Sequence, residues 1–188
     1  SVIIAKKDIN TAKKIADTLN TNYYHTSYSN DLNGVEVSAA IKNIFSMAVG
    51  AAKGLCSKNV SNDVREKNYL NTASALIKQS IYEMEIFVEH LNGKKETVKG
   101  LAGLGDLYVS CGGGRNAKMG AYIGEGLTFS QAKKTKMERV TVEGADLAKE
   151  IADKVKKDFD EKKLPLMLSM INAIVDDKKL ELNWELFR

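Results

Sequence analysis

The chain has 188 residues, of which 44% are hydrophobic and 28% charged, and 28 Lys and Arg against 24 Asp and Glu give a net charge of +4. This composition is that of a globular protein with one sizeable core, and its interleaved charges favour solvated helix faces over a nucleic-acid groove. We find no signal peptide, no apolar run near the roughly 18–20 residues of a membrane helix, and too few cysteines for a disulfide framework or a metal site, so we expect a cytoplasmic protein.

The first 30 residues predict a strand, a helix and a second strand. The run SVIIA at residues 1–5 is a short buried-strand pattern, Asp8 or Asn10 can cap the helix that follows, and residues 21–29 return to β-prone side chains. Because two strands and a helix do not make a stable sheet alone, we expect the edge of an α/β domain that lies upstream. The start at Ser1 without Met also indicates a fragment of something longer.

From Val35 onward the pattern is helical, with no comparable strand signal after residue 30. Apolar side chains recur at helical spacing along residues 63–91 and 143–159, and the only proline, Pro165, suits the first turn of a last helix. We therefore predict two parts, a strand–helix–strand in residues 1–33 and an all-α body in residues 34–188.

Lys42 stands in a segment that is apolar or small on nearly every side, VSAAIKNIFSMAVGAA at residues 37–52. Such a helix is usually buried all round, and only Lys42 and Asn43 interrupt it with strong hydrogen-bonding groups. An enclosed ammonium needs partners or gives up its proton, which makes it a candidate for acid–base or electrostatic chemistry. On spacing alone the alternative stays open that the lysine snorkels past the apolar stripe into solvent.

Residues 100–126 hold nine of the chain's 14 glycines, so backbone freedom or close backbone approach is concentrated there. The central sequence, GLAGLGDLYVSCGGGRN at residues 100–116, is neither a G-x-G-x-x-G dinucleotide motif nor a P-loop. Successive N–H groups of residues 112–114, followed by the donors of Arg115 and Asn116, suit a phosphate, whereas three glycines alone would also fit a flexible loop.

The same segment carries apolar side chains, which predict that it is packed: Leu101, Leu104, Leu107, Tyr108 and Val109. Asp106 lies among them, where a carboxylate needs a partner. If Asp106 converges with Lys42 and Arg115, the site offers an anion, a cation and a phosphate clamp. That set suits a small phosphorylated substrate with a hydroxyl or carbonyl group.

Three motifs resemble the NAD(P)-dependent sn-glycerol-3-phosphate dehydrogenases: GVEVSAAIKN at residues 34–43, GLAGLGDL at residues 100–107 and GGGRN at residues 112–116. The spacing between them and the VEG at residues 142–144 also fit. The resemblance covers essentially the whole chain. It implies an all-helical substrate domain, preceded in residues 1–33 by the last strand–helix–strand of a Rossmann domain. The fingerprint that binds NAD or NADP would lie upstream.

The resemblance also implies roles for individual residues. Lys42 would be the catalytic lysine that exchanges a proton with the substrate oxygen, with Asp106 beside it. Arg115 and Glu143 would contact the cofactor. Compared with many bacterial members, the segment before Arg115 is shorter and glycine-rich, so Ser110 would supply the hydroxyl there. The implied substrate-binding residues are Lys42, Asn43, Asp106, Ser110, Gly114, Arg115 and Asn116.

The reaction implied is reversible hydride transfer between glycerol 3-phosphate and dihydroxyacetone phosphate, for phospholipid synthesis or redox balance, with the isolated chain inactive. Two alternatives stay open. One is the substrate domain of a β-hydroxyacid or 6-phosphogluconate-type dehydrogenase, in which the asparagine usually follows the lysine by a turn. The other is a non-catalytic helical dimerisation module, and an exposed strand at residues 2–5 could itself pair with a second copy to give a homodimer.

Overall fold

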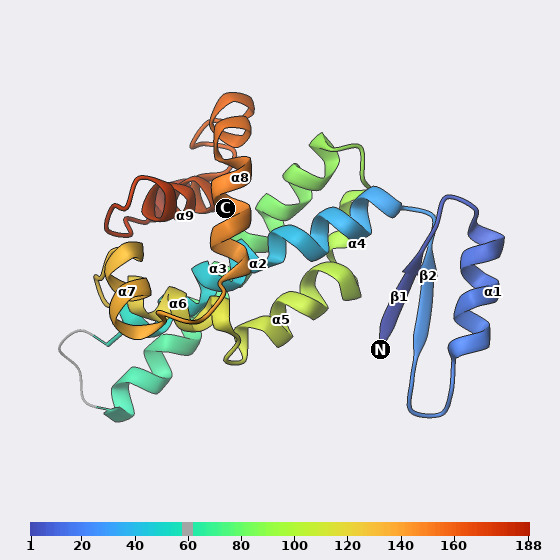
Figure 1. The fold of residues 1–188 in the computed structure, drawn as a ribbon, viewed down its shortest axis with the longest axis horizontal. Helices are drawn as coiled ribbons and strands as arrows, with labels where there is room; N and C mark the ends of the chain where they lie inside the picture. Colours follow the sequence, from blue (N-terminus) through green and yellow to red (C-terminus); the bar gives the residue numbers. More distant parts are fainter. Residues whose placement is uncertain (58–61) are drawn as a thin grey trace.

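One long helix, α2 (Leu32–Leu55), runs through the middle of the molecule, and the other helices of the body pack around it (Figure 1). The computed structural model describes residues 1–57 and 62–188, without the side chains of residues 62–68. After α2 the body consists of α3 (Asn62–His90), α4 (Lys95–Val98), the π-helix η1 (Leu101–Gly105), α5 (Asp106–Cys111), α6 (Arg115–Gly124), α7 (Phe129–Lys136), α8 (Glu143–Asp158), α9 (Pro165–Val175) and the 3₁₀ turn η2 (Trp184–Leu186). The predicted helices at residues 143–159 and from Pro165 are confirmed.

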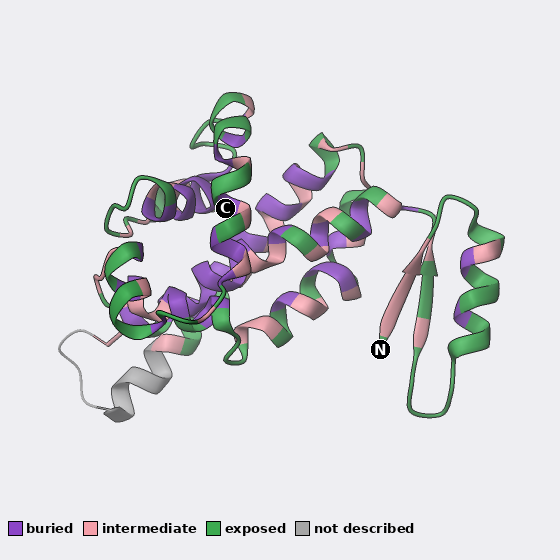
Figure 2. Cartoon of the chain, viewed as in Figure 1, coloured by how far each residue is buried: buried purple, intermediate pink, exposed green. Residues whose placement is uncertain are grey.

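The N-terminal piece is the predicted strand–helix–strand: β1 (Val2–Ala5), α1 (Ile9–Leu19) and β2 (Thr26–Ser29). The two strands are parallel, with Val2 opposite Thr26 and Ala5 opposite Ser29, as a helical crossover between them requires. Asp8 caps α1 by accepting a hydrogen bond from the backbone of Asn10. The piece lies to one side of the body and is largely exposed (Figure 2). In the described part of the chain no strand follows Ser29, so the body is helical as predicted.

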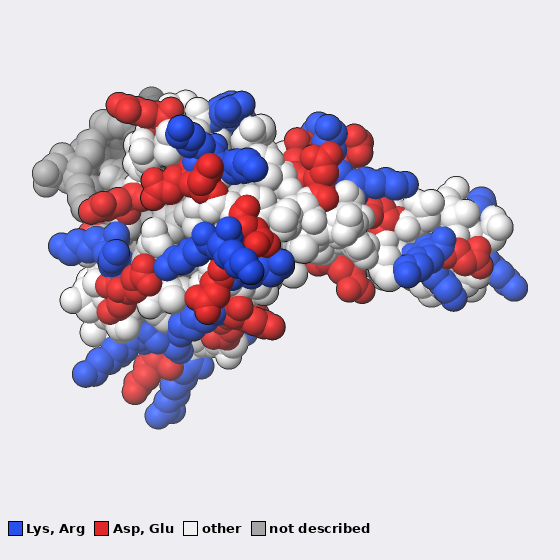
Figure 3. Space-filling view, turned by 90° about the horizontal axis from the view of Figure 1, so that it is seen from above, with Lys and Arg blue, Asp and Glu red and all other residues white. Residues whose placement is uncertain are grey.

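Charged side chains of both signs are interspersed over the face drawn in Figure 3. Several form ion pairs on exposed helix faces, such as Lys154 with Asp158 at 2.8 Å and Lys156 with Asp176 at 3.2 Å. This is the solvated charge pattern that the interleaved sequence of α8 predicts.

α2 is the core helix of the body. By length and composition alone it could cross a membrane, although Lys42 and Asn43 interrupt its apolar sequence. However, 67% of its most apolar stretch is buried inside the protein. There α3, α5, α6 and α8 pack against it. Its apolar character is therefore explained by its burial among these helices.

α2 and α6 approach so closely that their backbones touch. A Cβ atom added at Gly120 would lie 1.8 Å from the Met47 carbonyl oxygen, and one added at Gly50 would lie 2.2 Å from that of Ala117. The glycines recur at every fourth position on both helices, which gives each a flat face: Gly50, Gly54, Gly120 and Gly124. This contact fixes the first turn of α6 against the part of α2 that follows Lys42.

The start of α2 is held by Asp31. Its carboxylate accepts hydrogen bonds from the backbone N–H of Gly34 at 3.0 Å and of Lys94 at 2.9 Å, and from the Thr97 hydroxyl. Burial acts to raise the pKa of Asp31, but these hydrogen bonds outweigh it and lower the pKa below its usual value. Asp31 thus ties the first turn of α2 to α4.

Glu83 is a fully buried carboxylate on α3 that caps α9. It accepts hydrogen bonds from the backbone N–H of Leu166 and of Met167, both at 2.7 Å, and from the Gln79 amide at 2.8 Å. Burial raises the pKa of Glu83 to about 7, although the three hydrogen bonds act in the opposite direction. A negative charge at a helix N-terminus is favourable, which makes this a structural rather than a catalytic acid.

We expect Gly120→Ala to lower the free energy of unfolding by about 2–3 kcal/mol, because a Cβ atom 1.8 Å from the Met47 carbonyl forces α2 and α6 apart. Urea unfolding followed by circular dichroism measures this change. Gly100→Ala is the matched control, since its Cβ would lie no closer than 3.3 Å to another atom. Equal losses in the two variants would contradict the close contact of α2 and α6.

The raised pKa of Glu83 predicts a pH-dependent stability. The folded protein binds this proton more tightly than the unfolded chain, so the stabilisation is complete below the ordinary pKa of 4.5 and is lost as the pH rises through about 7. The loss is on the order of 3 kcal/mol. Glu83→Gln cannot ionise and should flatten the dependence between pH 5 and pH 8, as measured by urea unfolding. The same slope in both proteins would rule out Glu83 as its source.

Candidate active site

The ammonium group of Lys42 has two partners on α5. Its Nζ lies 2.8 Å from Oδ2 of Asp106 and donates a hydrogen bond to the Ser110 hydroxyl at 2.9 Å. The Lys42 side chain is only 15% exposed, so it is enclosed and paired rather than extended into solvent. The Asp106 side chain is 42% exposed, which leaves the pair open to solvent on one side.

Asp106 and Ser110 reach the same ammonium because they lie one turn apart on α5. The π-helix η1 leads directly into α5, and at Gly103 it passes so close to α4 that a Cβ atom would lie 2.0 Å from the Val98 carbonyl oxygen. Single π-helical turns often occur at functional sites. Here the turn delivers Asp106 as the first residue of α5. The sequence showed a glycine-rich run at this position but did not predict that it forms a π-helix.

The prediction that the apolar side chains around Asp106 are packed holds for some of them only. Leu107 is fully buried, whereas Tyr108 is 73% and Val109 71% exposed. The reason is that α5 lies on the surface and turns one face to α2, the face with Leu107 and Ser110. Leu104 on η1 is also exposed.

The carboxamide of Asn116 connects three helices. Its Nδ2 donates a hydrogen bond to Oδ1 of Asn43 on α2 at 3.1 Å, and its Oδ1 accepts one from the backbone N–H of Gly144 on α8 at 2.9 Å. Asn116 is 7% exposed. Gly144 was not among the predicted site residues, although the VEG motif at residues 142–144 pointed to this turn.

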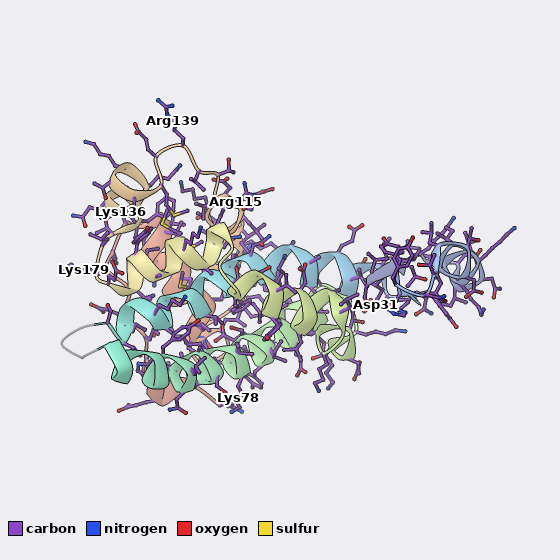
Figure 4. All side chains as sticks on the ribbon, turned by 90° about the horizontal axis from the view of Figure 1, so that it is seen from below. Asp31, Lys78, Arg115, Lys136, Arg139 and Lys179 are labelled. Atoms are coloured by element: carbon purple, nitrogen blue, oxygen red, sulfur yellow. The ribbon has the colours of Figure 1, made fainter. Side chains whose placement is uncertain are left out.

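Arg115 and Glu143 are the first residues of α6 and α8, and their side chains form an ion pair at the surface. In Figure 4 Arg115 lies at the end of α6, next to the loop from α5. In that loop Gly113 has φ = 124°, a left-handed conformation that favours glycine. Gly114 precedes α6 and offers no side-chain acceptor to the first N–H groups of the helix, so the helix end can receive an anion beside Arg115.

Cys111 ends α5 directly after Ser110. Burial raises the pKa of its thiol to about 12, although the nearby charge of Lys42 acts in the opposite direction. The thiol is therefore protonated at neutral pH and is no nucleophile. Among the residues that the structure describes, no group of three or more His, Cys, Asp or Glu side chains could hold a metal ion.

The sequence matches the family model described as "NAD-dependent glycerol-3-phosphate dehydrogenase C-terminus" over residues 31–183. Among curated proteins, the NADP(+)-dependent glycerol-3-phosphate dehydrogenase of Archaeoglobus fulgidus is 32% identical over 133 residues, which is 70% of this chain and 38% of that protein. Glycerol-3-phosphate dehydrogenase [NAD(P)+] of Halothermothrix orenii is 29% identical over 180 residues, which is 95% of this chain and 49% of that protein. The chain thus spans half or less of the length of these relatives.

Solved structures show the same likeness. Glycerol-3-phosphate dehydrogenase from Coxiella burnetii superposes with a TM-score of 0.71 at 26% identity, over 93% of this chain and 50% of that chain. The enzyme from Saccharomyces cerevisiae superposes with a TM-score of 0.73 at 20% identity, over 89% of this chain and 46% of that chain, and so supports the fold alone.

We expect Cys111 to resist iodoacetamide at pH 8 in the folded protein. A pKa of about 12 makes its thiolate roughly 10³-fold scarcer than that of an unperturbed thiol. Peptide mass spectrometry after timed labelling measures the rate, and labelling in urea, where Cys56 and Cys111 both react, is the control. Rapid labelling of folded Cys111 would contradict the enclosed environment next to Lys42.

Proposed function

The chain belongs to the NAD-dependent glycerol-3-phosphate dehydrogenase family, whose C-terminal domain matches residues 31–183, and we propose that it is the substrate-binding half of an enzyme that interconverts sn-glycerol 3-phosphate and dihydroxyacetone phosphate. Residues 34–188 would form the substrate domain, and residues 1–33 the last part of a Rossmann domain. The observation that carries the proposal is the enclosed contact of Lys42 with Asp106 and Ser110.

Lys42 is the proton donor and acceptor in this proposal. When the substrate carbonyl is reduced, negative charge develops on its oxygen, and a preorganised ammonium stabilises that charge. Asp106 holds the ammonium in place at 2.8 Å. Ser110 accepts a hydrogen bond from Lys42, so its own O–H is left to donate to a substrate oxygen. In the oxidising direction Lys42 must first be neutral, and its amine then takes up the proton of the substrate hydroxyl.

The start of α6 supplies the phosphate clamp. Arg115 offers a fork of donors that matches a phosphate, and the first N–H groups of the helix add the positive end of its dipole. Gly114 keeps this end free of a capping side chain. Asn43 and Asn116 complete the set, because their mutual hydrogen bond joins the helix of Lys42 to the helix of Arg115.

NAD or NADP supplies or receives the hydride when it is bound. Arg115 and Glu143 fit one edge of such a cofactor, because they present a partly exposed guanidinium and carboxylate where two helices begin. The cofactor fingerprint would belong to the upstream part, whose sheet would continue from the free edges of β1 and β2. By itself the chain would then be inactive, and the same edges could pair two copies as a homodimer. Both described cysteines are free, which supports a place in the reducing cytoplasm.

The contact of Lys42 with Asp106 also separates this proposal from the alternatives. A dimerisation module gives no reason for an enclosed lysine to meet a carboxylate and a hydroxyl. In a β-hydroxyacid or 6-phosphogluconate-type enzyme the asparagine would follow a turn later, whereas Asn43 here follows Lys42 directly and binds Asn116. The family match favours the glycerol-3-phosphate reaction over both.

We expect Lys42→Met in the full-length protein to lower kcat by roughly 10²–10⁴-fold, because the reacting oxygen loses its proton donor. The measurement is the oxidation of NADH or NADPH that depends on dihydroxyacetone phosphate. Lys53→Met is the matched control, since Lys53 lies on the same helix with an exposed side chain. If Lys42→Met kept kcat within about threefold of the unaltered protein, Lys42 would not be the catalytic acid.

A further inference from the structure

Both ends of the buried carboxamide of Asn116 are hydrogen-bonded to protein groups. The backbone N–H of Gly144 can only donate, so the group that faces it must be the Asn116 oxygen, at 2.9 Å. The Asn116 nitrogen therefore faces Asn43, whose oxygen accepts at 3.1 Å. The order of donors and acceptors is thus fixed from Gly144 through Asn116 to Asn43, and the Asn43 nitrogen is left as a donor next to Lys42.

Gly144 is required by the same contact. A Cβ atom at this position would lie 2.5 Å from the Asn43 carbonyl oxygen and 3.0 Å from the Asn116 side-chain oxygen. Val142, the residue before α8, provides no side-chain cap for the helix. Asn116 therefore takes the place of a capping residue for α8, across the gap between two helices.

This link sets the positions of two groups at the mouth of the site. Arg115 directly precedes Asn116 in the first turn of α6, and Glu143 directly precedes Gly144 in the first turn of α8. Their side chains pair with each other. The brace formed by Asn43, Asn116 and Gly144 thus holds the first turns of α6 and α8 in a fixed position relative to the helix that carries Lys42.

We propose that Asn116 is a positioning residue, which acts through Gly144 and Asn43 to place Arg115 relative to Lys42. The proposal rests on the proposed function for the identity of the substrate. It assigns Gly144, which touches no substrate, a share in the affinity for the phosphorylated compound.

A double-mutant cycle in the full-length protein tests the brace. Asn116→Ala, Gly144→Ala and the double variant are compared by kcat and KM for dihydroxyacetone phosphate and by Tm, with Asp146→Ala in the exposed part of the first turn of α8 as control. Each single variant should raise KM roughly tenfold with kcat changed less than about threefold. The double variant should be no worse than either single one, because both break the same link.

A capping variant separates the brace from a simple helix cap and covers the case in which Gly144→Ala fails to fold. Val142→Thr places a capping hydroxyl before α8 but does not restore the link from α8 to α6. Adding it to Asn116→Ala should therefore leave KM raised. Recovery of KM in this variant would overturn the brace, because a cap for α8 would then be all that Asn116 supplies.

Two further results would also overturn it. If the effects on KM multiply to roughly a hundredfold in the double variant, Asn116 and Gly144 act independently. If Tm falls while KM stays unchanged, the link is merely a helix cap. Failure of the unaltered protein to turn over dihydroxyacetone phosphate would instead refute the proposed function. The Tm values of the same variants would then decide on the brace. Equal losses of Tm in the single and double variants support it, and additive losses of Tm overturn it.

Discussion

The backbone contact between α2 and α6 is the constraint on which the candidate site depends. Because Gly50 and Gly120 have no side chains, the two helices lie closer than ordinary packing allows. That approach brings Asn116 within hydrogen-bond distance of Asn43 and so places Arg115 next to the helix of Lys42. A larger residue at either glycine would move Arg115 away from Lys42. The glycines are thus as much a part of the site as its charged residues.

Two carboxylates in the body, Glu83 and Asp106, have different environments and so differ in the roles open to them. Glu83 is fully buried, receives three hydrogen bonds from uncharged donors, and has its pKa raised to about 7 by burial. Asp106 is partly exposed and is paired with an ammonium that is itself enclosed. An ammonium with a carboxylate on one side and an opening on the other can meet a substrate oxygen, whereas a carboxylate enclosed by helix N–H groups cannot.

Some features of the fold and of the site could be predicted because they depend on residues that are close together in the sequence. Helical periodicity located α8, Pro165 marked the start of α9, and Lys42 stood out as one cation in an apolar helix. Other features depend on contacts between distant segments. Glu83 is buried because α9 packs over it, and its hydrogen-bond partner Leu166 lies more than 80 positions later in the chain. The mixed polar and apolar sequence of α3 gives no sign of this burial. That Asp106 and Lys42 lie close together was implied only by the family resemblance. Tyr108 and Val109 were predicted to be packed but are exposed, because a helix of six residues is too short for its apolar periodicity to define the buried face.

The most direct measurement compares dihydroxyacetone phosphate with dihydroxyacetone as substrates of the full-length protein, by the rate of NADH and NADPH oxidation. If Lys42 acts on a carbonyl whose phosphate is held at the start of α6, kcat/KM for the phosphorylated compound should exceed that for the other by roughly 100-fold or more, since the binding energy of the phosphate is used in the transition state. Equal values for the two compounds, or no oxidation of either cofactor, would contradict this account of the site.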